Sequence, residues 1–208
     1  HSSHRRQRQM CIRDSLNTAI PASDSEHDKK ACDFYDAQFN KLYLEPLYNQ
    51  KYPELLFESL LQKNLIKQSD LTFIKDGDLE TVATETDFLG VNYYSRGVIR
   101  SNEVDEDVND KPNVDLGPKT DFGWEVYPQG LYDLLKRLHV EYNVQDIIIT
   151  ENGCSHSDGP DENKTVNDTK RIEYHKSHVE QIQIAINDGI HCTGYFAWSF
   201  MDNFEWAE

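Results

Sequence analysis

The sequence lacks any long apolar run, and this absence excludes the first class of protein. No stretch approaches the roughly 18 apolar residues that a membrane-spanning helix needs. Positive charge is also scarce, because 21 Lys and Arg stand against 37 Asp and Glu among 208 residues, a formal net charge of -16. Such an acidic surface repels nucleic acid and anionic membranes. The sequence therefore predicts no nucleic-acid partner and no membrane partner.

Cysteine is rare as well, and its spacing excludes two further classes. The four cysteines show no C-x-x-C spacing and are scattered along the chain as Cys11, Cys32, Cys154 and Cys192. This pattern favours free thiols in a reducing compartment over a disulfide framework or a zinc site. We therefore expect a cytoplasmic protein with no metal and no cofactor.

Residues 1–15 differ in composition from the rest of the chain. They hold four arginines and almost nothing apolar, and they lack the apolar core of about 7–15 residues that a secretory signal needs. We interpret them as an extraneous, disordered tail, and residues 16–208 as the folded part.

The folded part alternates predicted helices and strands. The capping-box spacing from Ser23 to Glu26 predicts a helix that reaches about Leu44 and ends at Pro46. A second helix starts at Pro53, and leucine spacing predicts a third after Pro128. A fourth helix covers about 169–187, with a core-facing stripe predicted at Ile172, His175, Val179, Ile182 and Ile186.

Apolar runs at 88–94, 147–150 and 193–197 predict three strands between these helices. Alternating strands and helices predict an α/β fold with a parallel sheet and right-handed crossovers. The run from Ile147 to Ile149 suits a buried strand, and the Asn-Gly turn after it places Glu151 at the strand's carboxyl end. A carboxylate there either reacts, binds a ligand or merely faces solvent.

Polar and aromatic side chains follow each predicted strand. Indole faces stack on the apolar face of a sugar ring, while carboxylates and amides bind its hydroxyls. The alternative is that the tryptophans are bulky packing residues at the ends of the strands. The candidate residues are Asn92, Tyr94, Trp124, Glu151, Trp198, Glu205 and Trp206.

Five blocks of sequence follow one another along the chain. The first block is Leu16-Asn17 with Pro21-Ala22. The remaining blocks are Asp87-Phe-Leu-Gly-Val-Asn-Tyr-Tyr94, Gly123-Trp-Glu-Val-Tyr-Pro-Gln-Gly-Leu131, Ile149-Thr-Glu-Asn-Gly153 and Trp198-Ser-Phe-Met-Asp-Asn-Phe-Glu-Trp206. Five blocks in one order are far more specific than any single motif. Together they resemble the family 1 glycoside hydrolases, the β-glucosidase family, and the resemblance extends over nearly all of 16–208.

The resemblance implies part of a (β/α)8 TIM barrel, about strands 6 to 8 with their helices, incomplete at both ends. It also implies a retaining hydrolase in which two carboxyl groups flank the glycosidic bond. By position, Glu151 matches the nucleophile and Tyr94 the phenol that hydrogen-bonds it, with Asn92 beside them. A cis peptide is expected at Trp198-Ser199.

The resemblance also assigns substrate-binding roles. Glu205 and Trp206 match residues that hold the outer hydroxyls of the glycone, Trp198 matches its stacking floor, and Trp124 matches an aglycone platform. The expected partner is a β-glucoside or a short β-linked oligosaccharide.

One block of the family is missing, because no Asn-Glu-Pro occurs in this sequence. That block carries the acid/base residue, so we expect these 208 residues to be a fragment that is inactive alone. Two alternatives stay open: a non-catalytic carbohydrate-binding remnant, and a thioglucosidase, whose activated leaving group needs no general acid.

Overall fold

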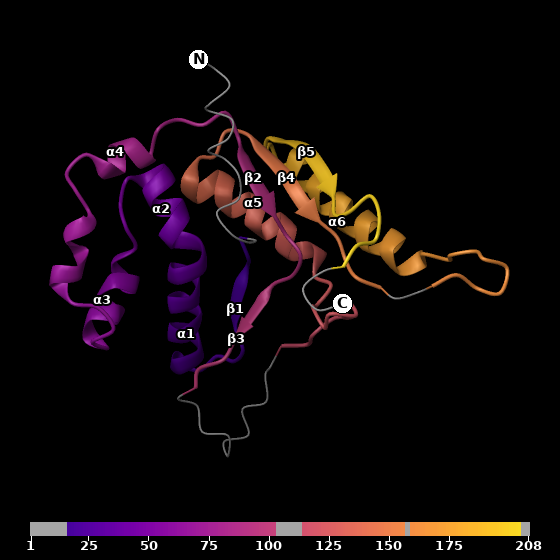
Figure 1. Cartoon of the computed structure of the whole chain (residues 1–208), viewed down its shortest axis with the longest axis horizontal. Helices are drawn as coiled ribbons and strands as arrows, with labels where there is room; N and C mark the ends of the chain where they lie inside the picture. Colours follow the sequence, from indigo (N-terminus) through magenta and orange to yellow (C-terminus); the bar gives the residue numbers. More distant parts are fainter. Residues whose placement is uncertain (1–15, 103–113, 157–158, 205–208) are drawn as a thin grey trace.

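A three-stranded parallel sheet forms the centre of the molecule (Figure 1). The computed structural model describes residues 16–102, 114–156 and 159–204. The sheet has the order β2-β4-β5, with bounds Leu89–Asn92, Ile147–Asn152 and Cys192–Ala197. Helix α5 (Pro128–Tyr142) joins β2 to β4, and helix α6 (Thr169–Asn187) joins β4 to β5. The predicted strand–helix–strand–helix–strand order is therefore confirmed.

A second, two-stranded parallel sheet was not predicted. It pairs β1 (Ala19–Pro21) with β3 (Gly97–Ile99), residues about 80 positions apart. Each strand has only three residues, all half-buried, so neither shows the period-2 pattern that identifies a strand. The partner in the other segment, rather than local sequence, decides this pairing.

The first helical segment is longer than predicted. Helix α1 (Glu26–Asp36) begins at the N-cap Ser25, whose hydroxyl accepts the Asp28 amide, rather than at Ser23. A π-helical turn, η2 (Ala37–Lys41), and α2 (Leu42–Asn49) follow without a break. The prediction that Pro46 ends the helix is wrong, since Pro46 lies inside α2 and is buried. A proline removes one helical hydrogen bond, and packing of this face outweighs that loss.

The shorter helices lie together with α1 and α2 on one side of the molecule (Figure 1). Helix α3 (Glu54–Gln62) follows its N-cap Pro53, as predicted. The 3₁₀-helix η3 (Gln68–Phe73) comes next, and then α4 (Asp78–Val82), which starts after the turn at Gly77. Gly77 has φ +87°, a conformation that glycine adopts at little cost.

The main core lies between the β2-β4-β5 sheet and helices α5 and α6. The predicted leucine stripe of α5 is confirmed, because Leu131, Leu134, Leu135 and Leu138 are all buried. The predicted stripe of α6 is correct only at Ile182, which is buried, because Ile172, Val179 and Ile186 are exposed. The buried face of α6 instead consists of Tyr174, His178, Ile182 and Ala185. Polar Tyr and His side chains occupy core positions there, which apolar spacing alone does not reveal.

Candidate active site

The carboxyl end of β4 carries Glu151 beside the end of β2. Glu151 pairs in register with Asn92, and the register shifts just before this pair. The Tyr93 amide donates to the Glu151 carbonyl at 2.9 Å. An irregularity at the end of a strand re-aims side chains, and such features are common next to active sites. The two strand ends are therefore held together at the position of the carboxylate.

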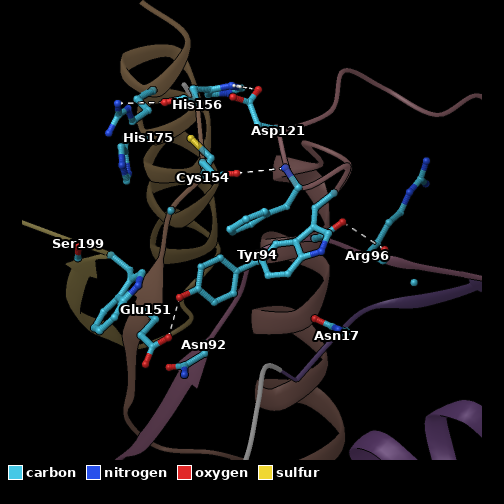
Figure 2. A pocket seen from close by; sticks show the side chains of 18 of the residues that line it. Asn17, Asn92, Tyr94, Arg96, Asp121, Glu151, Cys154, His156, His175 and Ser199 are labelled. Atoms are coloured by element: carbon cyan, nitrogen blue, oxygen red, sulfur yellow. Dashed lines mark hydrogen bonds and ion pairs between the residues drawn. The ribbon is translucent and has the colours of Figure 1, made fainter. Parts of the chain in front are cut away.

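Two hydrogen-bonded pairs of polar side chains lie at this point, and Figure 2 shows Tyr94, Glu151 and Asn92. The Tyr94 hydroxyl donates to Glu151 Oε2 at 2.7 Å. On the same strand ends, Thr150 Oγ1 donates to Asn92 Oδ1 at 2.7 Å. A hydrogen bond from a phenol to a carboxylate favours the ionised form and fixes its direction. The contact that the family resemblance implies between Tyr94 and Glu151 is thus present, while the catalytic roles of both residues stay predictions.

Asn152, next to Glu151, belongs to a network that sequence reasoning missed. Its side chain is fully buried and donates to the Tyr93 carbonyl at 2.7 Å and to the Tyr174 hydroxyl at 3.1 Å. Its Oδ1 accepts the Tyr195 hydroxyl at 2.8 Å. These bonds reach the residue that follows β2, helix α6 and strand β5, so they hold the strand end that carries Glu151 from three sides. The only sequence signal was the Asn-Gly pair itself, which we interpreted as a turn.

A cavity of about 750 Å³ opens in front of Glu151. Its wall brings together five of the seven predicted site residues, which come from four separate segments of the chain: Asn92, Tyr94, Trp124, Glu151 and Trp198. The other two, Glu205 and Trp206, lie outside the described residues. The volume is in the range of small-molecule sites, and mixed aromatic and polar walls are typical of them.

Both described tryptophans in the wall are partly accessible rather than packed in the core. Trp124 is 39% exposed and Trp198 45% exposed. The Trp124 ring packs against Tyr94, with ring centroids 5.5 Å apart, and against Phe122 at 5.6 Å. The peptide bond Trp198-Ser199 is cis, as expected. These two indoles therefore present ring surface to the cavity, which the packing alternative does not account for.

A buried ion pair, Arg96–Glu125, lies at the cavity wall, where Arg96 and Trp124 are both lining residues, and it was also missed. Arg96 donates to both carboxylate oxygens of Glu125, at 2.7 and 2.9 Å. Burial raises the pKa of Glu125, but hydrogen bonds from Arg96 and from the Gly117 amide outweigh it, so the pKa lies below its ordinary value. The two residues are 29 positions apart, and nothing in their local sequence marks them as partners.

The opposite wall of the cavity contains a second set of polar groups (Figure 2). Arg171 donates to Asp168 at 2.8 Å, to the His156 carbonyl at 3.3 Å, and to Asp202. Arg171 therefore connects the start of α6 to the loop that follows β5.

The Cys154 thiol also lines the cavity. Burial raises its pKa to about 12, so this thiol stays neutral.

No group of three or more His, Cys, Asp or Glu side chains among the described residues is arranged to hold a metal ion. In the same part of the chain, none of the helices combines the length and the apolar character that crossing a bilayer requires.

The fold and the site together define a class: parallel α/β proteins whose polar site lies at the carboxyl ends of the strands. Within that class, the chain belongs to glycosyl hydrolase family 1, whose model matches residues 1–208. The predicted family is confirmed.

Named relatives agree with this assignment. The chain is 40% identical over 197 residues to the 1,4-beta-D-glucan glucohydrolase of Thermotoga neapolitana, covering 90% of this chain and 43% of the relative. It is 40% identical over 193 residues to Beta-glucosidase A of Thermotoga maritima, covering 90% of this chain and 41% of that protein. The chain thus spans less than half the length of these relatives.

A solved structure gives the same result for the fold. The β-glucosidase from Exiguobacterium marinum superposes with a TM-score of 0.80 at 33% identity, over 92% of this chain and 42% of that one. With its parallel strands and crossover helices, the chain matches part of a family 1 barrel, as predicted.

Proposed function

We propose that this chain forms part of a retaining β-glucosidase in which Glu151 is the nucleophile. The observation that carries the proposal is the hydrogen bond of 2.7 Å from Tyr94 to Glu151 at the wall of an aromatic cavity. A nucleophilic carboxylate has to be ionised and correctly aimed, and this contact favours both conditions. The names of the family 1 relatives, a glucan glucohydrolase and a β-glucosidase, support the same reaction class.

In this proposal Glu151 attacks the anomeric carbon of a β-glucoside, and the bond to the aglycone oxygen breaks. A second carboxyl group, about 5–5.5 Å away, protonates that oxygen and later activates the water that releases the sugar. The sequence contains no Asn-Glu-Pro block, so we place this acid/base in a part of the enzyme outside these 208 residues. The chain alone is then expected to show no sustained turnover.

The side chains around Glu151 have separate roles in substrate binding. Asn92 lies close enough to Glu151 to contact a hydroxyl of the glycone next to the reacting carbon, because the two residues are in register. Trp198 stacks on the glycone ring, and Trp124 stacks on the aglycone. Glu205 and Trp206 bind the outer hydroxyls of the glycone. The substrate is a β-glucoside or a short β-linked oligosaccharide.

The test uses a hybrid barrel, defined as Beta-glucosidase A of Thermotoga maritima with its matching segment replaced by residues 16–208 of this chain. The hybrid barrel is expected to hydrolyse an aryl β-glucoside. The change Glu151→Gln keeps the size of the side chain and removes the nucleophile, so kcat should fall by about 10⁴-fold or more. Release of the aryl alcohol, followed by absorbance, measures the rate.

A matched control separates the loss of a nucleophile from the loss of a surface charge. Glu162 lies on the connection that follows β4 and is exposed, so Glu162→Gln should leave kcat within about twofold. Turnover by the Glu151→Gln hybrid at more than about a hundredth of the unchanged rate would overturn the assignment of the nucleophile.

A further inference from the structure

The Arg96–Glu125 pair lies at the cavity wall, which Arg96 lines together with Trp124. The side chains are only 8% and 6% exposed, and the contact is bidentate at 2.7 and 2.9 Å. Figure 2 shows the Arg96 side chain leading away from Glu151. A bidentate guanidinium–carboxylate contact fixes orientation as well as distance. The pair is thus placed to hold structure rather than to react.

Arg96 and Glu125 gather the segment 115–127 around themselves. The Arg96 guanidinium lies 3.7 Å from the centroid of the Tyr127 ring and donates to the Asp115 carbonyl at 3.3 Å. The Gly117 amide donates to Glu125 Oε1 at 2.9 Å. Contacts of the pair therefore reach both ends of the segment that carries Trp124.

This segment places Trp124 against Tyr94. Its carbonyl accepts the Thr120 amide at 2.8 Å, and its ring packs edge-on against Tyr94. Arg96 follows Tyr94 by two residues, and Glu125 follows Trp124 directly. The ion pair is therefore a short bridge between the strand end that holds Tyr94 and the segment that holds Trp124.

We propose that the Arg96–Glu125 pair is a positioning device that sets the distance of Trp124 from Tyr94 and Glu151 and so selects aromatic aglycones. The inference rests on the proposed function, because it refines the aglycone side of that same site. Neither side chain takes part in the reaction. Breaking the pair should displace the indole while the nucleophile and its phenol stay in place.

The test compares two β-glucosides in the hybrid barrel, one with a flat bicyclic aromatic aglycone and one with a methyl aglycone. Arg96→Met removes the two guanidinium N–H groups that donate to Glu125. The value of kcat/KM for the aromatic substrate should therefore fall about tenfold, mainly because KM rises. The value for the methyl glucoside should change less than about threefold. Arg96→Lys keeps the charge without the bidentate contact and should give an intermediate loss.

Arg137→Met is the matched control, since it breaks another partly buried guanidinium–carboxylate pair. Arg137 donates to both oxygens of Asp36, away from the cavity wall. This change should lower the melting temperature but leave the ratio of the two kcat/KM values within about twofold. A role in stability alone would instead make Arg96→Met act on both substrates equally, and that result overturns the proposal.

A double-mutant cycle keeps the inference testable if Arg96→Met folds poorly, because Glu125→Gln preserves the shape of the pair. In a Trp124→Leu background, Glu125→Gln should have no further effect on the substrate ratio. Independent, additive effects would contradict the inference. Failure of the proposed function would appear separately, as full turnover by the Glu151→Gln hybrid.

Discussion

At the scale of single residues, Tyr94 connects the two halves of the site. Its hydroxyl donates to Glu151, and its ring packs edge-on against Trp124. One side chain thus contacts both the proposed nucleophile and the proposed aglycone platform. Removing only the hydroxyl should separate the two contributions, because phenylalanine keeps the ring.

We expect Tyr94→Phe in the hybrid barrel to lower kcat/KM about 10- to 100-fold, since a hydrogen bond to a charged group contributes about 1.5–3 kcal/mol. Binding of the aromatic aglycone should change little. Steady-state kinetics on the aryl glucoside measures both effects.

The control is Tyr132→Phe, which removes another phenol–carboxylate bond of 2.7 Å, from Tyr132 to Asp188 on the exposed surface. That change should leave kcat/KM unaltered. Equal losses in the two variants would show that the bond to Glu151 has no special role.

The sequence predicted the residues that line the site better than the buried polar residues that hold them in place. Strand-end reasoning placed Tyr94 and Glu151 at one edge, the family resemblance added Trp124, and the structure brings all three to one cavity. Asn152 and the pair Arg96–Glu125 were missed, because their partners lie 22 to 59 positions away. Buried polar networks depend on tertiary packing, which local spacing does not encode.

At the scale of elements, helix α6 shows how a polar core face escapes sequence analysis. The apolar positions Ile172 and Val179 predicted its core stripe, yet both are exposed. Tyr174 and His178 are buried instead, with ring centroids 4.0 Å apart in a stacked arrangement. His178 Nδ1 lies 2.7 Å from the Tyr174 carbonyl, so the helix itself supplies one of its partners.

His178 should make stability depend on pH. Burial lowers its pKa to about 4, below its ordinary value of 6.5, so the unfolded chain binds the proton more readily. The contribution of neutral His178 is fully present above pH 6.5 and is lost as the pH falls toward 4. The loss amounts to about 2–3 kcal/mol in unfolding free energy at the acid end.

His178→Phe should therefore flatten the pH dependence of unfolding of the hybrid barrel between pH 7 and pH 4.5. Urea unfolding followed by circular dichroism gives the free energies. His139→Phe is the control, because His139 is exposed on α5 and the change should leave the pH dependence unchanged. If the unfolding free energy of the His178→Phe variant fell with pH as steeply as that of the unchanged hybrid barrel, this account would be refuted.

The sequence predicted elements most accurately where a helix has an apolar stripe or a strand has a continuous apolar run. The leucine stripe of α5 and the apolar run of β4 were both found from spacing alone. The pairing of β1 with β3 and the π-helical turn η2 were not found. Three-residue strands and a single widened turn have no sequence period, so only the contacts of the folded chain define them.

At the scale of the whole molecule, apolar surface remains uncovered on two neighbouring elements. Among the described residues β5 pairs only with β4, and on β5 Phe196 is 61% exposed. On α6, the side chain of Ile172 is 64% exposed and that of Val179 is 44% exposed. Open parallel edges and contiguous apolar surface favour association with further chain. The relatives are more than twice as long as the matched segment, so further chain is available to cover such surface.

We therefore expect the isolated 208-residue chain to bind a hydrophobic dye and to aggregate, whereas the hybrid barrel should melt cooperatively as a monomer. The double change Ile172→Glu with Val179→Glu should have opposite effects in the two contexts. In the isolated chain it should reduce dye binding, because charge replaces exposed apolar surface. In the hybrid barrel it should lower the melting temperature, because the same positions become buried.

Val140→Glu is the control for these opposite effects on the isolated chain and on the hybrid barrel. Val140 is 69% exposed on α5, away from the open edge of β5, so the added charge should be nearly neutral in both contexts. Light scattering and dye fluorescence measure the isolated chain, and thermal melting measures the hybrid barrel. A sharp, cooperative melt of the isolated chain as a monomer would contradict the argument, because the uncovered faces of α6 and β5 would then need no partner.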